Sequence, residues 1–456
     1  MQGVYVVGVA PRVRWKHPQP MPAQGDTGTL TGVCLRPMRS RAVKGTYDVL
    51  PDAQPAWTQL ERAATRVLGH AGMQRLTTPV FEHSEVFDRS VGESADLVVQ
   101  KEMYRFEDRG GRSLTLRPEF TAGVLRAFVT HGMHTWPTPV KLWSLGPAFR
   151  AENVQRGRFR QFHQLNAEFL GLPSPLLDAE AIALLHDLLN ALGLSDLRVK
   201  LGSVGDPEDR AAYNAYLRDA LAPHAGELSA NSRARLDVNP MRILDSKDES
   251  DQALLAGLDK PLDRLGPDAR EHLDRVAQAL SDWGIAFDMA PSIVRGLDYY
   301  RRTAFEIHAE GIGAQSALAG GGRYDGLVET LGGPPTPGIG WALGVERVFD
   351  AMREAGTLHT GAAKPDLYLV PMDDLAVTEA AELARSLRQR LTVTHAYTAR
   401  KPAKGLKDAD RSGARFAALR GERERATGVW TVKNLATGDQ FESTTERLAD
   451  TIDGTS

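Results

Sequence analysis

The first clear pattern along the chain is an amphipathic helix over Pro55 to Ala71. Its apolar residues recur every three or four positions, which places on one face Trp57, Leu60, Ala64, Val67 and Leu68. Met73 to Phe81 follows with strand character. Because proline has no backbone N–H to give to a ladder, Pro79 indicates that this strand lies at an edge or an interface.

Two apolar runs, Val140 to Phe149 and Gln161 to Leu170, read as strands separated by the polar stretch Ala151 to Arg160. This arrangement predicts an antiparallel hairpin with a long, charged tip. Alternate residues of a strand point to the same side of a sheet. The second strand therefore presents on one face Phe162, Gln164, Asn166 and Glu168.

Helical periods dominate the middle of the chain. Leu176 to Leu192 predicts one helix, and residues 205–290 predict a mostly helical insertion broken by proline and glycine. Strand character returns at residues 293–307 and 315–320, and a last helix is expected over Val345 to Ala355.

Residues 356–365 are small and polar, which indicates a linker and a domain boundary. Beyond it, strands are expected over 366–371, 392–397, 416–419 and 428–434, and helices over 374–391 and 404–412. Strands that alternate with helices predict a small α/β domain with a largely parallel sheet.

Composition narrows the class of protein. The 456 residues are 42% hydrophobic and 25% charged, which is ordinary for a folded chain of two or three domains. A net charge of −3 argues against a uniformly basic nucleic-acid coat but allows a local basic patch. Cys34 is the one cysteine, which excludes a disulfide within the chain and a zinc site of four cysteines. No apolar run approaches the ~20 residues of a membrane span, so the cytoplasm is the simplest compartment.

Residues 1–43 differ from the rest. Within the first 37 residues, four basic side chains stand against the single acid Asp26. A leader rich in arginine and poor in acids is typical of a targeting peptide, but no apolar stretch follows the charges. A disordered extension, or a start codon upstream of the true one, is the favoured interpretation.

Two short segments carry the densest polar chemistry. Arg295-Gly-Leu-Asp-Tyr-Tyr300 places a cation, an acid and two phenols within six residues. Ala319-Gly-Gly-Gly-Arg-Tyr-Asp-Gly326 follows shortly after it. Glycine runs let a backbone approach another group closely, and the tyrosines can line a polar pocket while still packing.

The predicted hairpin is a second candidate site. Arg150, Arg156 and Arg158 suit a bidentate grip on phosphate or carboxylate. The polar face of its second strand adds an aromatic plate, an amide and an acid, a set that suits a purine beside a small polar ligand. On these residues alone, a solvated hairpin with surface ion pairs is about equally favoured.

These ordered segments resemble those of histidyl-tRNA synthetases. Phe149-Arg-Ala-Glu152, the basic loop and Phe162-His-Gln164 resemble motif 2 of the class II aminoacyl-tRNA synthetases in its histidyl form, and Gly338 to Arg347 resembles motif 3. Pro55 to Phe81 fits motif 1, and the two segments rich in glycine and tyrosine resemble the signature segments of the family. The resemblance runs from about Lys44 to the C-terminus.

The resemblance implies a fold and an activity. The fold is an α+β catalytic domain built on an antiparallel β-sheet over 44–355, with the helical insertion at about 205–290, and an α/β anticodon-binding domain over 366–456. The activity is histidine–tRNA ligase: ATP and L-histidine give histidyl-adenylate and diphosphate, and the histidine then passes to the 3′ end of tRNA(His). Mg²⁺ with the triphosphate and a homodimer are also implied.

By the family pattern, Arg150 would hold the α-phosphate of ATP and Arg347 the γ-phosphate. Arg295 would lie near the substrate carboxylate and the α-phosphate, where other class II enzymes often use a metal ion. The other expected ATP contacts are Glu152, Arg158 and Phe162. The histidines of the chain show no metal-ligand spacing, so no protein metal site is expected.

The resemblance also implies a histidine pocket and tRNA contacts. Glu168 and Tyr300 would read the two imidazole nitrogens, and Tyr324 would close the wall. The α-ammonium group would meet Glu119, Thr121 and Gln164. Contacts to tRNA are expected at Gln155, Arg156, Arg400, Lys404, Lys407 and Arg411.

Several residues also suit a plainer role. Glu119 could be an acid at a helix start. Adjacent strand residues face opposite sides, so Tyr299 is expected in the core when Tyr300 faces a ligand, and His163 is expected to face away from Gln164. The arginines of the insertion could lean on the tRNA acceptor stem or simply be solvated.

Two other functions compete with the ligase. Catalytically silent relatives serve as a regulatory subunit of ATP phosphoribosyltransferase, but they lack the C-terminal domain and parts of the signature segments, all of which are present here. A stand-alone nucleotide-binding module would explain the glycine-rich stretch, yet not six ordered segments over nearly the whole chain.

Overall fold

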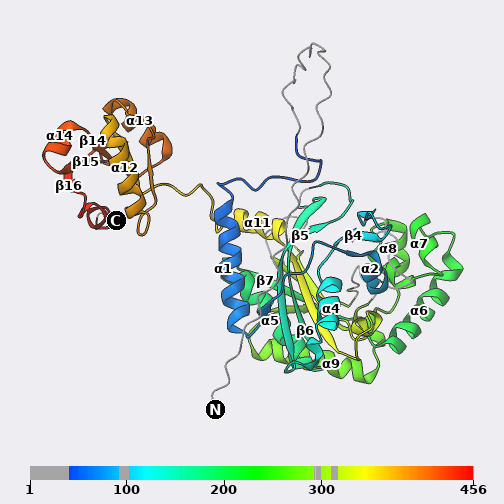
Figure 1. Cartoon of the computed structure of the whole chain (residues 1–456). Coiled ribbons are helices and arrows are strands. Elements are labelled where there is room, and N and C mark those ends of the chain that lie inside the picture. Colours follow the sequence, from blue (N-terminus) through cyan, green and yellow to red (C-terminus); the bar gives the residue numbers. More distant parts are fainter. Residues whose placement is uncertain are drawn as a thin grey trace, which may run out of the picture. The chain divides into compact units, whose positions relative to one another are not determined.

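The predicted hairpin forms the longest strands of an eight-stranded sheet (Figure 1). The structure is a computed structural model that describes residues 41–91, 102–155, 157–291, 293, 299–309 and 317–454. β5 (Val140–Phe149) and β6 (Gln161–Leu170) pair antiparallel along their whole length. Both predicted strands are confirmed to the residue.

The other strands extend this sheet on both sides of the hairpin. The order is β1 (Gln74–Arg75), β5, β6, β11 (Gly338–Gly344), β10 (Ala317–Arg323), β9 (Arg301–Ala309), β7 (Leu197–Ser203) and β8 (Phe287–Met289). Only the outermost pairs, β1 with β5 and β7 with β8, are parallel. The antiparallel sheet expected for the catalytic domain is therefore confirmed.

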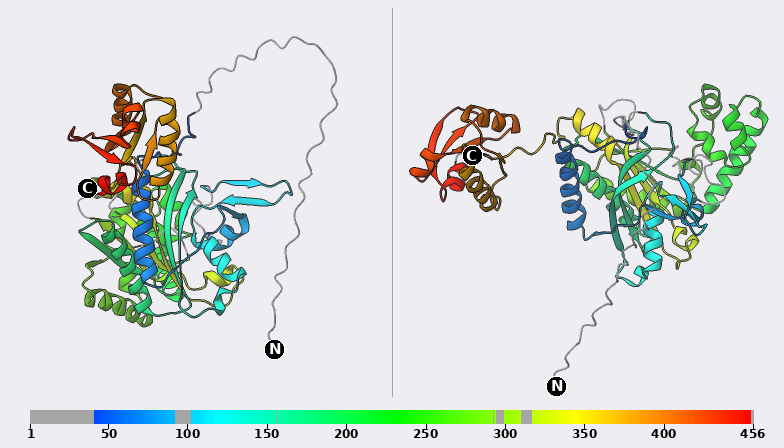
Figure 2. Two further views of the ribbon diagram at one scale, coloured as in Figure 1. Left: turned by 60° about the vertical axis from the view of Figure 1, so that its left-hand side comes forward. Right: turned by 45° about the horizontal axis from the view of Figure 1, so that its top comes forward.

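One face of this sheet is buried under four helices: α1 (Gln54–His70), α5 (Pro175–Ala191), α9 (Pro267–Asp282) and α11 (Val345–Glu354). Figures 1 and 2 show α1 lying along the strands. Leu165, Ala167 and Phe169 alternate along β6 and enter the core beneath these helices. The intervening residues of β6 consequently point to the opposite face.

α4 (Thr121–Thr130) packs on part of the opposite face, in a smaller apolar cluster that includes Phe128, Leu142 and Tyr324. α10 (Leu327–Thr330) and the short 3₁₀ turn Met133–Thr135 contribute residues to the same apolar cluster. The polar residues of β6 are left facing a cavity beside this cluster.

The strand expected over Met73 to Phe81 is broken. β1 covers only Gln74–Arg75 and lies at the edge of the main sheet, whereas β2 (Phe81–His83) joins a separate three-stranded sheet. Pro79 lies between them and has no N–H for either ladder, which explains the break. The second sheet is completed by β4 (Ser113–Leu116) and β3 (Arg105–Glu107), with α2 (Ser84–Val91) following β2.

The helical region at 205–290 divides in two. α6 (Pro207–Leu221), α7 (Ala230–Arg235) and α8 (Glu249–Leu255) share small apolar clusters of their own, with 3₁₀ turns at 222–224, 240–245 and 261–264. In Figure 2 they gather to one side of the sheet. By contrast, α9 buries Leu273, Val276 and Leu280 in the main core and β8 joins the main sheet.

The C-terminal part has its own five-stranded sheet and apolar core. Its elements are β12 (Leu367–Pro371), α12 (Asp374–Leu387), β13 (Val393–His395), α13 (Pro402–Ser412), β14 (Phe416–Arg420), α14 (Glu422–Ala426), β15 (Val429–Asn434), β16 (Gln440–Thr444) and α15 (Leu448–Asp453). The expectation of a largely parallel sheet is wrong. β13, β12 and β14 are parallel, but β14, β15 and β16 are antiparallel. A tight turn after Asn434, whose side chain accepts from the backbone N–H of Ala436, returns the chain at once as β16.

A buried ion pair joins the elements of the main sheet and its helices. Asp178 on α5 and Arg323 on β10 are both fully buried and form a salt bridge. The same carboxylate accepts hydrogen bonds from Thr303 on β9 (2.6 Å) and pairs with His272 on α9 (2.8 Å). Arg323 also binds Asp325 at 2.9 Å. Burial acts to raise the pKa of Asp178, but the hydrogen bond with His272 and then the charge and hydrogen bonds of Arg323 hold it below its usual value.

We expect Asp178→Ala to destabilise the fold by about 3–5 kcal/mol, because it leaves a buried guanidinium without its main partner. Urea or thermal unfolding of the two proteins measures the loss. The control is Arg353→Ala, which removes a solvent-exposed pair with Asp350 and should change stability little. Equal effects of the two substitutions would contradict the assignment of Asp178 as the central pairing group.

Candidate active site

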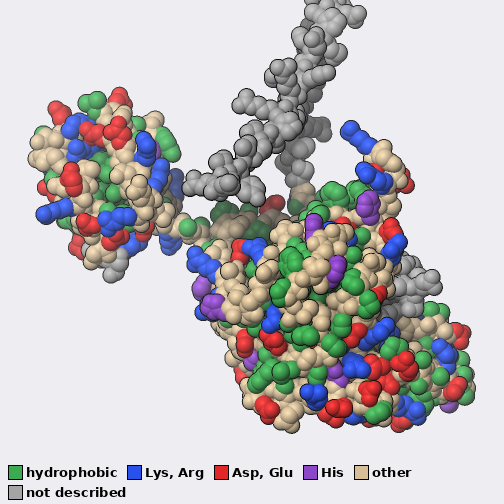
Figure 3. Space-filling model, turned by 60° about the horizontal axis from the view of Figure 1, so that its bottom comes forward, with side chains coloured by type: hydrophobic (Ala, Val, Ile, Leu, Met, Phe, Trp, Pro, Cys, Tyr) green, Lys and Arg blue, Asp and Glu red, His purple; other side chains and the backbone are tan. Residues whose placement is uncertain are grey.

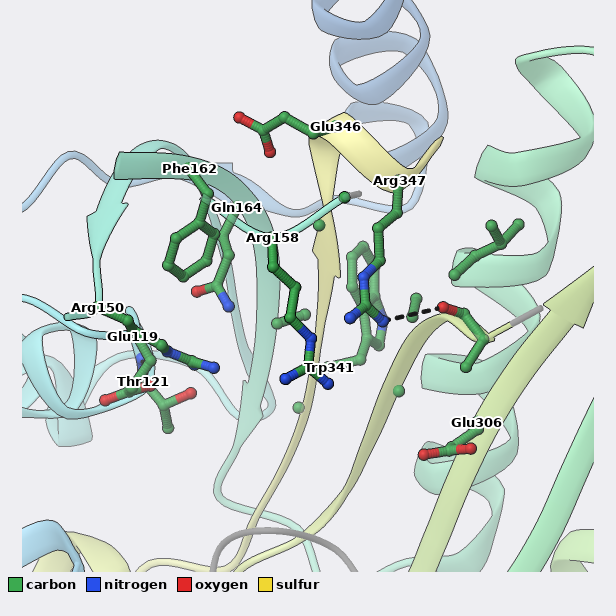
Figure 4. A pocket seen from close by; sticks show the side chains of 18 of the residues that line it. Glu119, Thr121, Arg150, Arg158, Phe162, Gln164, Glu306, Trp341, Glu346 and Arg347 are labelled. Carbon is green, nitrogen blue, oxygen red and sulfur yellow. Dashed lines mark hydrogen bonds between the residues drawn. The ribbon is translucent and has the colours of Figure 1, made fainter. Parts of the chain in front are cut away.

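A cavity of about 500 Å³ opens on the polar face of β6. Its walls come from the hairpin, the start of α4, β9, β10, β11 and the first turn of α11. Figure 4 shows the side chains that line it. The chain segments that form it are far apart in sequence, so the sheet is what brings them together.

Most residues expected to bind ATP or histidine surround this one cavity. It is lined by Arg150, Glu152, Arg158, Phe162 and Arg347 of the ATP set, and by Glu119, Thr121, Gln164, Tyr300 and Tyr324 of the histidine set. Glu168 lies directly behind Thr121 and Tyr324 and bonds to both. Arg295 and Arg156 lie outside the described residues.

Glu168 is a buried carboxylate at the floor of the cavity. Its oxygens accept hydrogen bonds from the Thr121 hydroxyl (2.7 Å), the Asn166 amide (3.0 Å) and the Tyr324 hydroxyl. Burial raises the pKa of Glu168 to about 8, although these hydrogen bonds act in the opposite direction. The folded protein therefore keeps Glu168 protonated to a higher pH than an exposed glutamate.

Glycines make room for this floor. A Cβ atom on Gly340 would lie 1.9 Å from Glu168 Oε2, and one on Gly338 would lie 2.4 Å from the Tyr324 ring. A Cβ atom on Gly322 would lie 2.8 Å from the Tyr300 ring, and one on Gly321 would lie 2.1 Å from the carbonyl oxygen of Gly340. Of the glycines at 320–322, only Gly320 lines the cavity. The run thus serves close packing of strands and tyrosines as well as access to a ligand.

Glu119 lies at a helix start and also faces the cavity. Its carboxylate accepts hydrogen bonds from the backbone N–H groups of Thr121 (2.5 Å) and Ala122 (2.9 Å), at the first turn of α4. It also lines the cavity. Burial raises the pKa of Glu119, and these backbone hydrogen bonds counteract part of the effect.

Three guanidinium groups line the cavity and form what we call the arginine wall. Arg150 lies over the Phe162 ring, 5.2 Å from its centre, and donates from Nε to the carbonyl of Pro118 at 3.0 Å. Arg158 pairs with Glu152 at 3.2 Å, and Figure 4 shows Arg158 and Arg347 extending side by side into the cavity. Burial, then the positive charge of Arg158, lowers the pKa of Arg347. Such a wall suits a ligand that carries several negative charges.

Tyr299 and Tyr300 do not face opposite sides, so the expectation that Tyr299 is a core residue is wrong. Both line the cavity, with ring centres 4.8 Å apart. β9 begins only at Arg301, and the alternation of a strand does not apply before it. Tyr299 also makes an edge contact with Tyr324.

His163 lies outside the cavity, as expected. Its Nδ1 is 2.9 Å from Glu346 Oε1, and its ring contacts Trp57. Sequence reasoning did not single out several residues of the cavity wall, among them Glu102, Glu306 and Trp341. The buried indole N–H of Trp341 has no hydrogen-bond partner among the described residues. In the sequence, only the position of Trp341 within a glycine-rich strand indicated that it could line a cavity.

The residues expected to contact tRNA are spread over separate surfaces. Lys404, Lys407 and Arg411 are exposed and share one face of α13, whereas Arg400 pairs with Asp408 at 3.4 Å. Gln155 is exposed at the tip of the hairpin. On the face shown in Figure 3, positive and negative side chains are interspersed.

In the insertion, Arg233 is already engaged by its own surroundings. Its guanidinium donates to the backbone carbonyls of Ala225, Gly226 and Leu228. This favours a structural role for it over contact with the acceptor stem.

Two general features concern metals and membranes. Among the residues that the structure describes, no three His, Cys, Asp or Glu side chains gather so as to hold a metal ion. In the same part of the chain, every helix is too short or too polar to cross a bilayer.

Comparison with known proteins gives the family. The sequence model described as Histidyl-tRNA synthetase matches residues 45–348, about two thirds of the chain. The chain belongs to the histidyl-tRNA synthetase family. A second model, described as Anticodon binding domain, matches residues 366–455.

Individual relatives agree with this assignment. The chain is 54% identical to the histidine–tRNA ligase of Thermus thermophilus, over 90% of this chain and 98% of the relative. It is 50% identical to that of Deinococcus deserti, over 90% and 94% of the two chains. A solved structure of apo S. aureus histidyl-tRNA synthetase superposes with a TM-score of 0.77 at 33% identity, covering 91% of this chain and 99% of the other.

Gly340→Ala should abolish the synthetase's binding of its amino acid, because the added methyl group would displace the Glu168 carboxylate. Calorimetric titration with L-histidine measures the loss. The matched control is Gly69→Ala on α1, where a Cβ meets nothing within 4 Å. This change should leave binding intact and stabilise the helix by about 0.5–1 kcal/mol. Normal binding by Gly340→Ala would contradict the crowding described here.

The raised pKa of Glu168 predicts a pH dependence of stability. Between the ordinary glutamate pKa of about 4.3 and about 8, the folded state keeps a proton that the unfolded chain releases, so this contribution is full at low pH and is lost as pH rises through about 8. Relative to Glu168→Gln, which cannot ionise, the free energy of unfolding of the wild type should fall by roughly 1.4 kcal/mol per pH unit between pH 5 and 8. Thermal unfolding at each pH measures this as a falling midpoint. Parallel pH profiles for the two proteins would rule out this titration.

Proposed function

We propose that this chain acts as a histidine–tRNA ligase. It activates L-histidine with ATP to give histidyl-adenylate and diphosphate, then transfers histidine to the 3′ end of tRNA(His). The observation that carries the proposal is one cavity with a buried acidic floor at Glu168 and Glu119 and a wall formed by Arg150, Arg158 and Arg347. The ammonium group of an amino acid and a polyanionic nucleotide can both be held there.

Adenylate formation brings the histidine carboxylate onto the α-phosphate of ATP, so two anions must approach. Positive groups held in place where charge develops supply much of the catalysis in such steps. Arg150 would hold the α-phosphate, with Phe162 under the adenine and Glu152 at its edge. Arg347, helped by Arg158, would hold the outer phosphates. The assignment of Arg295 to the attacking carboxylate depends on the family pattern alone.

The histidine side chain would be read by groups at the cavity floor. A neutral imidazole has one donor and one acceptor nitrogen. Glu168 would accept from one nitrogen and Tyr300 would donate to the other, with Tyr324 holding Glu168 in place. Glu119, Thr121 and Gln164 would receive the α-ammonium group. An analogue without these nitrogens would leave buried polar groups unpaired, a penalty of ~10⁴–10⁵ in specificity.

ATP would enter with Mg²⁺ bound to its triphosphate. The carboxylate of Glu306 on the cavity wall is an oxygen donor of the kind that this ion accepts. The ion would neutralise phosphate charge and keep the outer phosphates in one arrangement. No cage made only of protein ligands is proposed for it.

Transfer to tRNA would use the rest of the chain. The exposed basic face of α13, with Arg400 beside it, would meet phosphates around the anticodon, and Gln155 and Arg156 at the hairpin tip would approach the acceptor end. No side chain stands out as a base, so a phosphate oxygen of the adenylate would take the proton. We further propose the division into residues 44–355 and 366–456, a homodimer and a cytoplasmic location.

The regulatory alternative is disfavoured. It would predict the loss of the C-terminal domain and of signature residues, whereas the C-terminal sheet, Arg150, Glu152 and Arg347 are all present. The high identity to histidine–tRNA ligases over nearly their whole length supports the same choice.

The test is ATP–diphosphate exchange with the purified full chain, offered each of the twenty amino acids separately. Exchange with histidine alone is expected, because the floor suits an imidazole and the arginine wall a triphosphate. Arg150→Ala should suppress the exchange by two or more orders of magnitude, as expected for loss of one charged contact to the transition state (~10²–10³). Exchange with another amino acid, or none at all from a folded protein that binds histidine, would overturn the proposal.

A further inference from the structure

The segment just before α1 is fastened to the loop of the hairpin. The carbonyl of Gly45 accepts hydrogen bonds from the backbone N–H groups of Arg160 (2.8 Å) and Gln161 (3.1 Å). Gly45 has a φ of +88°, and a Cβ atom there would lie 2.8 Å from Arg160 Cγ and 2.9 Å from Val154 Cγ2. Only glycine fits this close approach. We call residues 45–47 the strap.

Tyr47 connects the strap to both the hairpin loop and α11. Its hydroxyl donates a hydrogen bond of 2.6 Å to Glu346 Oε1, across 299 positions of sequence. Its ring packs on Phe159 of the hairpin loop, with ring centres 5.1 Å apart. One side chain therefore contacts the segment that carries Arg158 and the helix turn that carries Arg347.

Glu346 is held entirely by neighbours outside the arginine wall. Besides the Tyr47 hydroxyl, its carboxylate accepts from the backbone N–H of His163 at 3.0 and 3.1 Å and pairs with His163 Nδ1 at 2.9 Å. The His163 ring is in turn fixed by Trp57 of α1, 4.5 Å away. Glu346 is only 9% exposed, yet within the described part of the chain it forms no ion pair with an arginine.

The direction of this carboxylate matters because Glu346 immediately precedes Arg347. Figure 4 shows Glu346 pointing away from Arg347 and Arg158 at the rim of the cavity. A carboxylate turned inward would pair with these guanidinium groups and repel a triphosphate. Each donor that holds Glu346 outward therefore keeps the arginines available to an anion.

We propose that Tyr47 is a positioning residue for the nucleotide: the strap holds Glu346 away from the arginine wall and fixes the hairpin loop to α11, so that Arg158 and Arg347 both face the outer phosphates of ATP. This inference rests on the proposed function only in naming ATP as the anion. The floor of the cavity is built from Thr121, Glu168 and Tyr324, none of which contacts the strap, so histidine binding is independent of it.

The test is Tyr47→Phe, which removes the hydroxyl and keeps the ring on Phe159. In ATP–diphosphate exchange we expect KM for ATP to rise about three- to tenfold, the size expected for loss of one ordinary hydrogen bond, because the hydroxyl acts on ATP only through Glu346. KM for histidine should stay unchanged. Tyr213→Phe is the matched control, because it removes a buried hydroxyl that donates to Asp259 in the insertion. It should change neither constant.

A second variant separates positioning from a general structural effect. If the rise of KM for ATP in Tyr47→Phe comes from the freed Glu346 carboxylate, adding Glu346→Gln should lower this KM part of the way back. The reason is that an uncharged amide competes poorly for the arginines. Calorimetric titration of the same proteins with ATP and Mg²⁺, without histidine, gives a readout that survives failure of the ligase proposal. An unchanged ATP constant in folded Tyr47→Phe, equal rises for ATP and histidine, or no recovery in the double variant would each overturn the inference.

Discussion

The buried pair of Asp178 and Arg323 is the interaction on which the active-site side of the sheet depends. It joins α5 to β10, and through Thr303 and His272 it also fixes β9 and α9. Taking two charges out of water is costly, and removing one partner leaves the other charge buried and uncompensated. The residue after Arg323 is Tyr324, whose hydroxyl holds Glu168 at the cavity floor.

The two faces of the sheet carry different kinds of side chain. Along β6, every second residue packs under the helices, and the intervening ones lie on the cavity side, where Phe162 and Gln164 line the cavity and Asn166 and Glu168 bond to each other behind it. Absent side chains matter as much as present ones, since Gly338 and Gly340 leave the space that Tyr324 and Glu168 occupy. The cavity is thus shaped by how closely the strands and their side chains approach, and its polarity follows from the register.

The hydrophobic pattern of the sequence predicted those elements that depend on the spacing of neighbouring residues. The hairpin strands and α11 appear where alternation and helical spacing place them, and the arginine wall follows from their register. Long-range pairing was not available from pattern: Asp178 lies on the buried face of α5, and its partner is 145 positions away. Boundaries set by irregular backbone also failed, as at Pro79 and before Arg301, because periodicity carries no signal where the ladder stops. β16 was not predicted because the turn after Asn434 was not recognised from the sequence.

The floor of the cavity has a consequence for how the chain becomes active. Thr121 and Glu168 bond across 47 positions, and Glu168 and Tyr324 across 156, so no early portion of the polypeptide contains a complete site. During synthesis the sheet cannot close until β10 and β11 have left the ribosome, and pairings of such separation form slowly. Histidine can therefore stabilise the finished domain by mass action but cannot guide its assembly, and a nascent chain must reach native order without its ligand.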